Sequence, residues 1–141
     1  MKNLLLIAFA FASFTMIGQN IEYNLNKKGV IVDGYDVVAY FVSNEAVKGK
    51  KKHQTIHENI TFQFSSEENL QLFLKDPKKY VPQYGGWCAY ATKTTGGKVK
   101  VDPKTFEIRD GKLYLFYDTW RSQYFNLLEK RNSRRVAGNN P

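Results

Sequence analysis

The sequence predicts an α+β fold, a small single domain of short antiparallel strands and hairpins with two or three helices. Two pairs of apolar runs are joined by the two-residue turn signals Glu58-Asn59 and Asp110-Gly111, which predicts two hairpins. Segments with helical spacing of apolar residues follow each pair, and no regular βαβ crossover is present. The single cysteine, Cys88, has no partner for an internal disulfide, so packing of the many aromatic side chains must hold the fold together.

The first eighteen residues have the pattern of a secretory signal peptide. Lys2 precedes an uncharged apolar run from Leu4 to Ile17, which is shorter than the roughly 20 residues that a transmembrane helix needs. We expect cleavage before Gln19 and a periplasmic or secreted product that is not transmembrane after cleavage. Residues 19–33 then form a polar lead-in to the domain.

The first half of the domain is expected to be rich in strands. The runs Val30 to Val32 and Val37 to Val42 are β-rich and lie on either side of the turn signal Asp33-Gly34. After a lysine-rich loop at residues 48–52, two strands at Gln54 to His57 and Ile60 to Phe64 are expected to pair.

The helices are predicted from caps and breakers. Ser65 and Glu68 have the spacing of a capping box, and Asp76-Pro77 ends the helix that they begin. Gly85-Gly86 opens a short helical segment, Trp87 to Thr92.

A second hairpin and a final helix complete the domain. The hairpin is expected to pair Phe106 to Arg109 with Lys112 to Tyr117. A last helix from Trp120 to Lys130 should pack through Tyr124, Leu127 and Leu128. Residues 131–141 form a basic tail.

The charge and the missing motifs limit the function. A net charge of +8 on an exported chain favours an anionic envelope surface or an acidic partner, and not nucleic acid. The sequence has no glycine-rich phosphate loop, no paired metalloprotease histidines and no nucleophile elbow. We therefore expect a protein that is not an enzyme.

A small set of residues could bind a soft or borderline metal ion, copper or zinc. Cys88 lies where a helix begins, and the helix dipole there favours a thiolate. His53 and His57 are four residues apart on one strand, so their rings project from the same face. Imidazole and thiolate together suit copper or zinc. The sequence predicts Cys88 and His57 as ligands, with His53 or Asp36 assisting.

Two other interpretations remain open. In one, the domain is a metal-free module that binds a small molecule or a protein partner in an aromatic pocket, and Asp36 orients a polar group. In the other, Cys88 is a reactive thiol that forms mixed disulfides with an outside thiol. The aromatic residues expected to line the pocket are Tyr35, Tyr40, Tyr84, Trp87 and Tyr90.

Residues 34–130 resemble the exported single-domain branch of the YHS domain family. The run around Gly85 to Ala89 is the most specific part of the resemblance. The matching stretches are Gly34 to Phe41, Val47 to Gly49, Phe62 to Asn69, Asp76 to Tyr80, Pro82 to Ala91, Asp102-Pro103 and Asp110 to Leu115.

The resemblance implies a metal-associated, YHS-like binding module. Relatives carry cysteines at positions that match Ala39, Ser65 and Asn69 in this chain. Because none of these three residues has a thiol, the thiolate cage of those relatives cannot form here. Metal binding would then depend on Cys88, His57 and Asp36.

Overall fold

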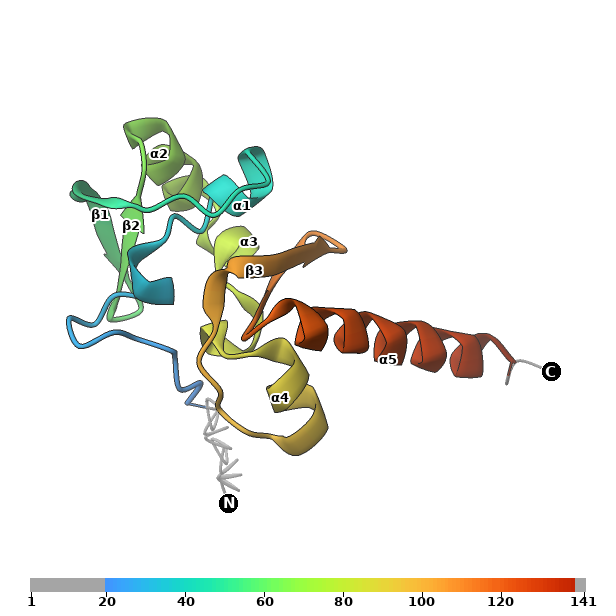
Figure 1. The fold of residues 1–141 in the computed structure, drawn as a ribbon. Coiled ribbons are helices and arrows are strands. Elements are labelled where there is room, and N and C mark those ends of the chain that lie inside the picture. The colour runs from blue at the N-terminus through green and yellow to red at the C-terminus, as the bar shows by residue number, and fades with distance from the viewer. Residues whose placement is uncertain (1–19, 139–141) are drawn as a thin grey trace, which may run out of the picture.

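A computed structural model describes residues 20–138, so the predicted signal peptide at residues 1–18 lies outside the described residues. The fold is α+β, as the sequence predicts, with two antiparallel two-stranded sheets among short helices (Figure 1). Within residues 20–138, no helix is both long and apolar enough to cross a membrane. The elements in chain order are η1 (Val32–Gly34), α1 (Ala39–Val42), β1 (Lys50–His57), β2 (Ile60–Phe64), α2 (Glu67–Lys75), α3 (Pro77–Tyr80), η2 (Gln83–Gly86), α4 (Ala89–Thr95), β3 (Asp102–Arg109), β4 (Lys112–Phe116) and α5 (Thr119–Gly138).

Both predicted hairpins are confirmed. β1 pairs with β2 across the Glu58-Asn59 turn, and β3 pairs with β4 across Asp110-Gly111. All four turn residues have positive φ, from 50° at Glu58 and Asp110 to 70° at Gly111. Two consecutive residues of positive φ are what a tight hairpin turn needs to follow the twist of its strands. β1 is longer than predicted and takes in part of the lysine-rich loop.

The strand predicted at Val37 to Val42 is wrong, because this segment forms a turn followed by α1. Oδ1 of Asp36 accepts hydrogen bonds from the backbone N–H groups of Val38 (2.9 Å) and Ala39 (3.1 Å). These bonds satisfy the first free donors of the helical turn and outweigh the β preference of the valines.

α2 begins one residue later than its predicted capping box. Oγ of Ser66, not of Ser65, accepts the hydrogen bond from the N–H of Asn69 at 3.2 Å. Ser65 is used elsewhere, since both its N–H and its hydroxyl donate to Asp36. Pro77 then begins α3, where its missing N–H costs nothing.

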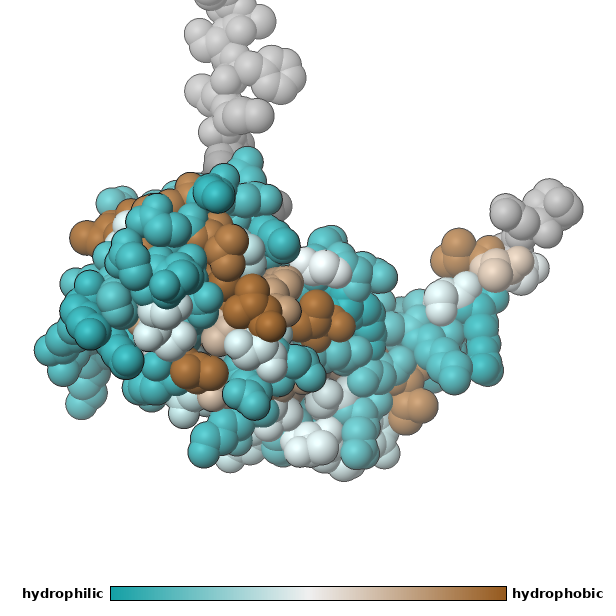
Figure 2. All heavy atoms as spheres, turned by 90° about the horizontal axis from the view of Figure 1, so that it is seen from above, coloured by the Kyte–Doolittle hydropathy of each residue, from teal (hydrophilic) through white to brown (hydrophobic). Residues whose placement is uncertain are grey.

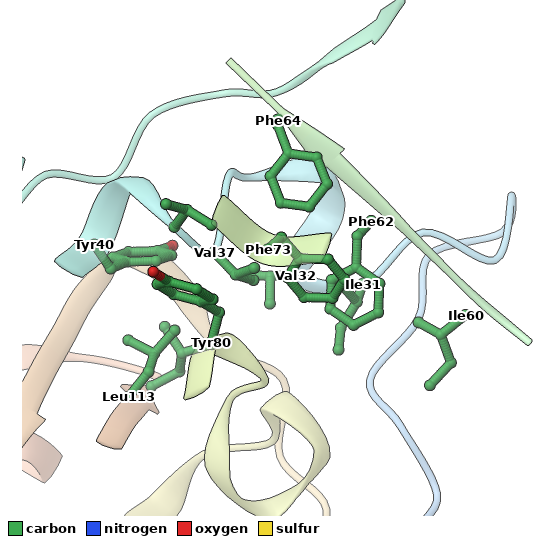
Figure 3. Close-up of a cluster of buried hydrophobic side chains, with 12 residues drawn as sticks. Ile31, Val32, Val37, Tyr40, Ile60, Phe62, Phe64, Phe73, Tyr80 and Leu113 are labelled. Carbon is green, nitrogen blue, oxygen red and sulfur yellow. The ribbon is translucent and has the colours of Figure 1, made fainter. Parts of the chain in front are cut away.

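Two hydrophobic clusters form the core. In the larger one, Phe73 of α2 lies between Phe62 and Phe64 of β2, with ring centroids 4.6 and 5.1 Å away (Figure 3). The smaller one joins α4, β4 and α5, and its buried members are Cys88, Ala89, Ala91, Phe116 and Phe125.

α5 is anchored at its first half and projects from the body of the domain (Figure 1). Phe125 is its buried residue, packed on Phe116 at 5.4 Å between ring centroids. The predicted packing face is only partly correct, because Leu128 is half-buried and Tyr124 packs on Tyr90, but Tyr124 is 44% exposed and Leu127 is 62% exposed. Ion pairing of Lys93 with Glu129 and a hydrogen bond from Arg109 to Asn126 fix the helix to α4 and β3.

The lead-in is strapped to the turn that precedes Cys88. We call residues 21–24 the N-terminal strap. The backbone N–H and the side-chain amide of Asn24 donate to the carbonyls of Gly85 (2.9 Å) and Gly86 (3.1 Å). The Trp87 indole N–H donates to the carbonyl of Glu22 at 2.9 Å. The strap thus forms part of the domain.

Candidate functional site

An apolar hollow of about 450 Å³ lies between the N-terminal strap and the chain around Tyr84. Its volume falls within the range of small-molecule sites. We call it the Tyr84 groove. Its lining residues are Ile21, Tyr23, Glu58, Lys78, Val81, Pro82, Gln83, Tyr84 and Gly85.

The wall of the groove contains a strained backbone. Tyr84, Gly85 and Gly86 all have positive φ, with 56° at Tyr84. A left-handed conformation at a residue with a Cβ costs of order 1–3 kcal/mol, and such residues cluster at functional sites. Here the conformation leaves the side chain of Tyr84 39% exposed, with its ring centroid 6.2 Å from that of Tyr114.

The polar side chains of the groove are two phenols, two opposite charges and the amide of Gln83. Burial raises the pKa of Tyr84 above its ordinary value, with a smaller contribution from Tyr114. Burial also raises the pKa of Tyr23, and the neighbouring carboxylate of Glu58 adds to the effect. Both phenols therefore stay neutral at physiological pH and can donate a hydrogen bond. Glu58 and Lys78 supply one negative and one positive charge to the lining.

Cys88, the first predicted metal ligand, is enclosed by apolar groups. It is the N-cap residue of α4 with 0% exposure, and its neighbours in the smaller cluster include Phe116 and Phe125. Its backbone N–H donates to the carbonyl of Val99 at 2.9 Å. This packing suits a small apolar thiol.

The two histidines lie on the half-buried face of β1, toward α2. The His57 ring packs edge-on against Phe73, with centroids 5.8 Å apart, and its Nε2 is 3.9 Å from Glu58. Nδ1 of His53 is 3.3 Å from a carboxylate oxygen of Glu67. The predicted common face is thus present, but His57 contacts the larger cluster whereas Cys88 belongs to the smaller one.

Asp36 is buried at 0% exposure, and both of its carboxylate oxygens accept hydrogen bonds. Besides the two bonds to α1, Oδ2 accepts from the N–H of Ser65 (2.8 Å), its hydroxyl (2.7 Å) and the side-chain amide of Asn69 (2.7 Å). Ala39, Ser65 and Asn69 therefore all bond to one carboxylate. The arrangement joins α1 to the start of α2. Across residues 20–138, no three or more His, Cys, Asp or Glu side chains are grouped so that they could hold a metal ion.

The five aromatic residues predicted to share one pocket have different surroundings. Tyr84 lines the groove, and the Trp87 indole bonds to the strap. The buried Tyr40 donates its hydroxyl to the carbonyl of Pro103 at 2.7 Å, and burial raises its pKa. The ring of Tyr35 lies under the ammonium of Lys48. Tyr90 packs on Trp120 and Tyr124 of α5.

Sequence reasoning missed Ile21 and Tyr23, which line the groove from the strap. Their signal is the alternation of Ile21, Tyr23 and Leu25 in an otherwise polar segment. Such a period of two is typical of an extended segment with one face against the domain.

The burial of Cys88 can be tested by thiol labelling. We expect a disulfide reagent such as DTNB to label the native protein on the order of 100-fold more slowly than the urea-unfolded chain, because labelling requires the smaller cluster to open. The signal is unambiguous, since Cys88 is the single cysteine of the sequence. Equal rates in the two states would contradict the buried thiol and would favour the reactive-thiol interpretation.

Comparisons with known proteins add no assignment: no family model, no curated protein and no solved structure matches this chain.

Proposed function

We propose that this protein is an extracytoplasmic, non-enzymatic binding module whose Tyr84 groove takes the aromatic or branched apolar group of a small organic ligand. The observation that carries the proposal is the apolar groove itself, one wall of which is built on the left-handed Tyr84. The extracytoplasmic location comes from the signal-like residues 1–18 of the sequence.

The chemistry of the lining supports this kind of ligand. Ile21, Val81 and Pro82 give an apolar floor that an aromatic ring could cover. The neutral phenols of Tyr23 and Tyr84 can orient a polar substituent by hydrogen bonds. Lys78 could pair with an anionic end group of the ligand, and Glu58 with a cationic one. Probes of both charges therefore identify the sign of the ligand's charge.

Binding of copper or zinc through Cys88 and His57 stays a prediction from the sequence and receives less support. The thiol is enclosed by apolar side chains, and the imidazole packs against Phe73. A zinc-dependent or copper(I)-dependent rise in melting temperature that is absent from Cys88→Ala would favour the metal-binding module over the groove.

The groove is tested by NMR titration of the ¹⁵N-labelled protein with three probes: indole, 3-phenylpropionate and phenethylamine. We expect shift changes to centre on Ile21, Tyr23 and Val81, and the Ile21→Asp variant to bind the best probe at least about tenfold more weakly, because a carboxylate must then be covered by an apolar ring. The two charged probes differ in the sign of their end group, so their ranking identifies whether Lys78 or Glu58 contacts the ligand.

The matched control is Ile56→Asp. Ile56 is an isoleucine on β1 that is 71% exposed and does not line the groove, whereas Ile21 is 58% exposed and does. The control should bind each probe as the wild type does. Loss of binding in both variants, or shift changes spread over the surface, would overturn the groove as a ligand site.

A further inference from the structure

One side of α5, which we call the outer face, points away from the domain. Trp120, Tyr124 and Leu127 follow one another at spacings of four and three residues, so they lie in one row along the helix. They are 51%, 44% and 62% exposed. Phe125 and Glu129 lie on the opposite side, where Phe125 packs on Phe116 and Glu129 pairs with Lys93. The apolar row touches the domain at Tyr90 of α4, which packs on Trp120 and Tyr124, and about half of each row residue's surface stays open to solvent.

The first turns of the outer face carry an aromatic cluster. The Trp120 ring centroid is 4.4 Å from that of Tyr124 and 5.9 Å from that of Tyr90 on α4. Packing against α4 fixes these rings while leaving about half of Trp120 open to solvent. Trp and Tyr, which combine an apolar body with a polar tip, are enriched where an apolar phase meets water.

The last turns of the same helix are basic. Residues 130–138 contain Lys130, Arg131, Arg134 and Arg135 and no acidic residue. Arg131 and Arg134 continue the row of Leu127 at spacings of four and three residues. The one acid of α5, Glu129, pairs with Lys93 of α4. In Figure 2 the projecting end of α5 is mostly hydrophilic.

Apolar and basic groups meet in one hollow on this helix. A depression of about 470 Å³ is lined by Tyr124, Leu127, Leu128, Lys130, Arg131 and Arg134. An occupant that matches this lining must have an apolar part next to an anionic part. A phospholipid with an anionic head group has both.

We propose that the outer face of α5 binds the surface of an anionic phospholipid membrane. The aromatic cluster lies at the level of the head groups, and the guanidinium groups of Arg131, Arg134 and Arg135 contact the phosphates, which the planar fork of arginine suits. The projection of α5 from the domain favours a membrane over an acidic protein, because a projecting helix can lie directly on a bilayer surface, whereas a protein partner must offer a groove that fits it. This surface is separate from the Tyr84 groove, and neither proposal depends on the other.

The test is co-sedimentation with vesicles made of equal parts of phosphatidylglycerol and phosphatidylcholine. The chain should begin at Gln19, which keeps every described residue and removes the apolar residues 1–18. Each basic side chain near an anionic surface contributes about a fivefold factor, so replacing Arg131, Arg134 and Arg135 by Gln should weaken binding on the order of 100-fold. Wild-type binding should also fall with added salt and be at least about tenfold weaker to pure phosphatidylcholine.

The matched control replaces Lys50, Lys51 and Lys52 by Gln. These lysines are exposed on β1, so the variant loses the same charge from a different surface. It should bind nearly as well as wild type. An equal loss of vesicle binding in the two triple variants would mean that binding depends only on the net charge of the protein. That result would overturn the assignment of the membrane surface to α5.

Two further readouts address the apolar row and the alternative partner. Anionic vesicles should shift the tryptophan emission to shorter wavelength in the wild type but not in Trp120→Phe, which keeps Trp87. An unchanged shift in that variant would overturn the role of the aromatic cluster. If the wild type does not bind anionic vesicles but binds immobilised poly-glutamate through the same arginines, the outer face binds an acidic protein and the lipid proposal is wrong.

Discussion

Replacing Asp36 by alanine is expected to lower the free energy of unfolding by about 3–5 kcal/mol. The carboxylate accepts five hydrogen bonds at full burial, three of them from the backbone N–H groups of Val38, Ala39 and Ser65. Removing it leaves these donors without partners in the interior and separates α1 from the start of α2. Urea denaturation followed by circular dichroism measures the loss.

Two further variants serve as controls for the prediction on Asp36. Asp36→Asn retains an oxygen that can accept from Val38 and Ala39, so it should be less destabilised than Asp36→Ala and should fold even if the alanine variant does not. Asp76→Ala removes an exposed carboxylate without a side-chain cap hydrogen bond, and we expect a change within about 0.5 kcal/mol. If Asp36→Ala were as stable as Asp76→Ala, the Asp36 cluster would not hold the fold.

Replacing Gly85 by alanine should have the next largest effect. Gly85 has a φ of +65°, and a Cβ built there would lie 2.6 Å from the carbonyl oxygen of Glu22 in the N-terminal strap. The alanine must adopt an unfavourable backbone and also push the strap away, at a combined cost of about 2–5 kcal/mol. Thermal unfolding measures the cost. Cleavage near residues 21–24 by a protease of broad specificity should become faster, because the strap loses its contact.

Gly96→Ala separates the two causes. Gly96 has a similar φ of +70°, but a Cβ there would meet nothing within 4 Å. It should carry the backbone cost alone, about 1 kcal/mol, and should leave the protease sensitivity of the strap unchanged. Equal destabilisation in the two variants would contradict the close contact of the strap with Gly85.

The parts of the fold that were predictable from the sequence are those specified by neighbouring residues. Glu58-Asn59 and Asp110-Gly111 determine their hairpins within a few positions, and the helix between Ser66 and Asp76 has its own cap and breaker. α1 was not predictable in this way, because Asp36 is held by Ser65 and Asn69, which lie 29 and 33 residues further along the chain.

The candidate site was predictable only in part. Tyr84 belongs to the predicted aromatic set, but the opposite side of the groove comes from Ile21 and Tyr23 in the lead-in, more than 60 residues away in sequence. Helical spacing also left the orientation of α5 ambiguous. Leu128 follows Phe125 by three residues and Tyr124 by four, so the spacing allows either aromatic ring to face the domain, and the contact with Phe116 decides that Phe125 turns inward.

The attachment of the strap has a consequence for how the chain is made. The hydrogen bonds from Asn24 to Gly86 and from Trp87 to Glu22 join positions 62 and 65 residues apart. A ribosome builds the chain from its first residue, so residues 21–24 have no docking site until the Gly85 to Trp87 turn has been synthesised. Residues 21–24 therefore stay undocked while the first half of the domain emerges, and they join the fold only when the second half is complete.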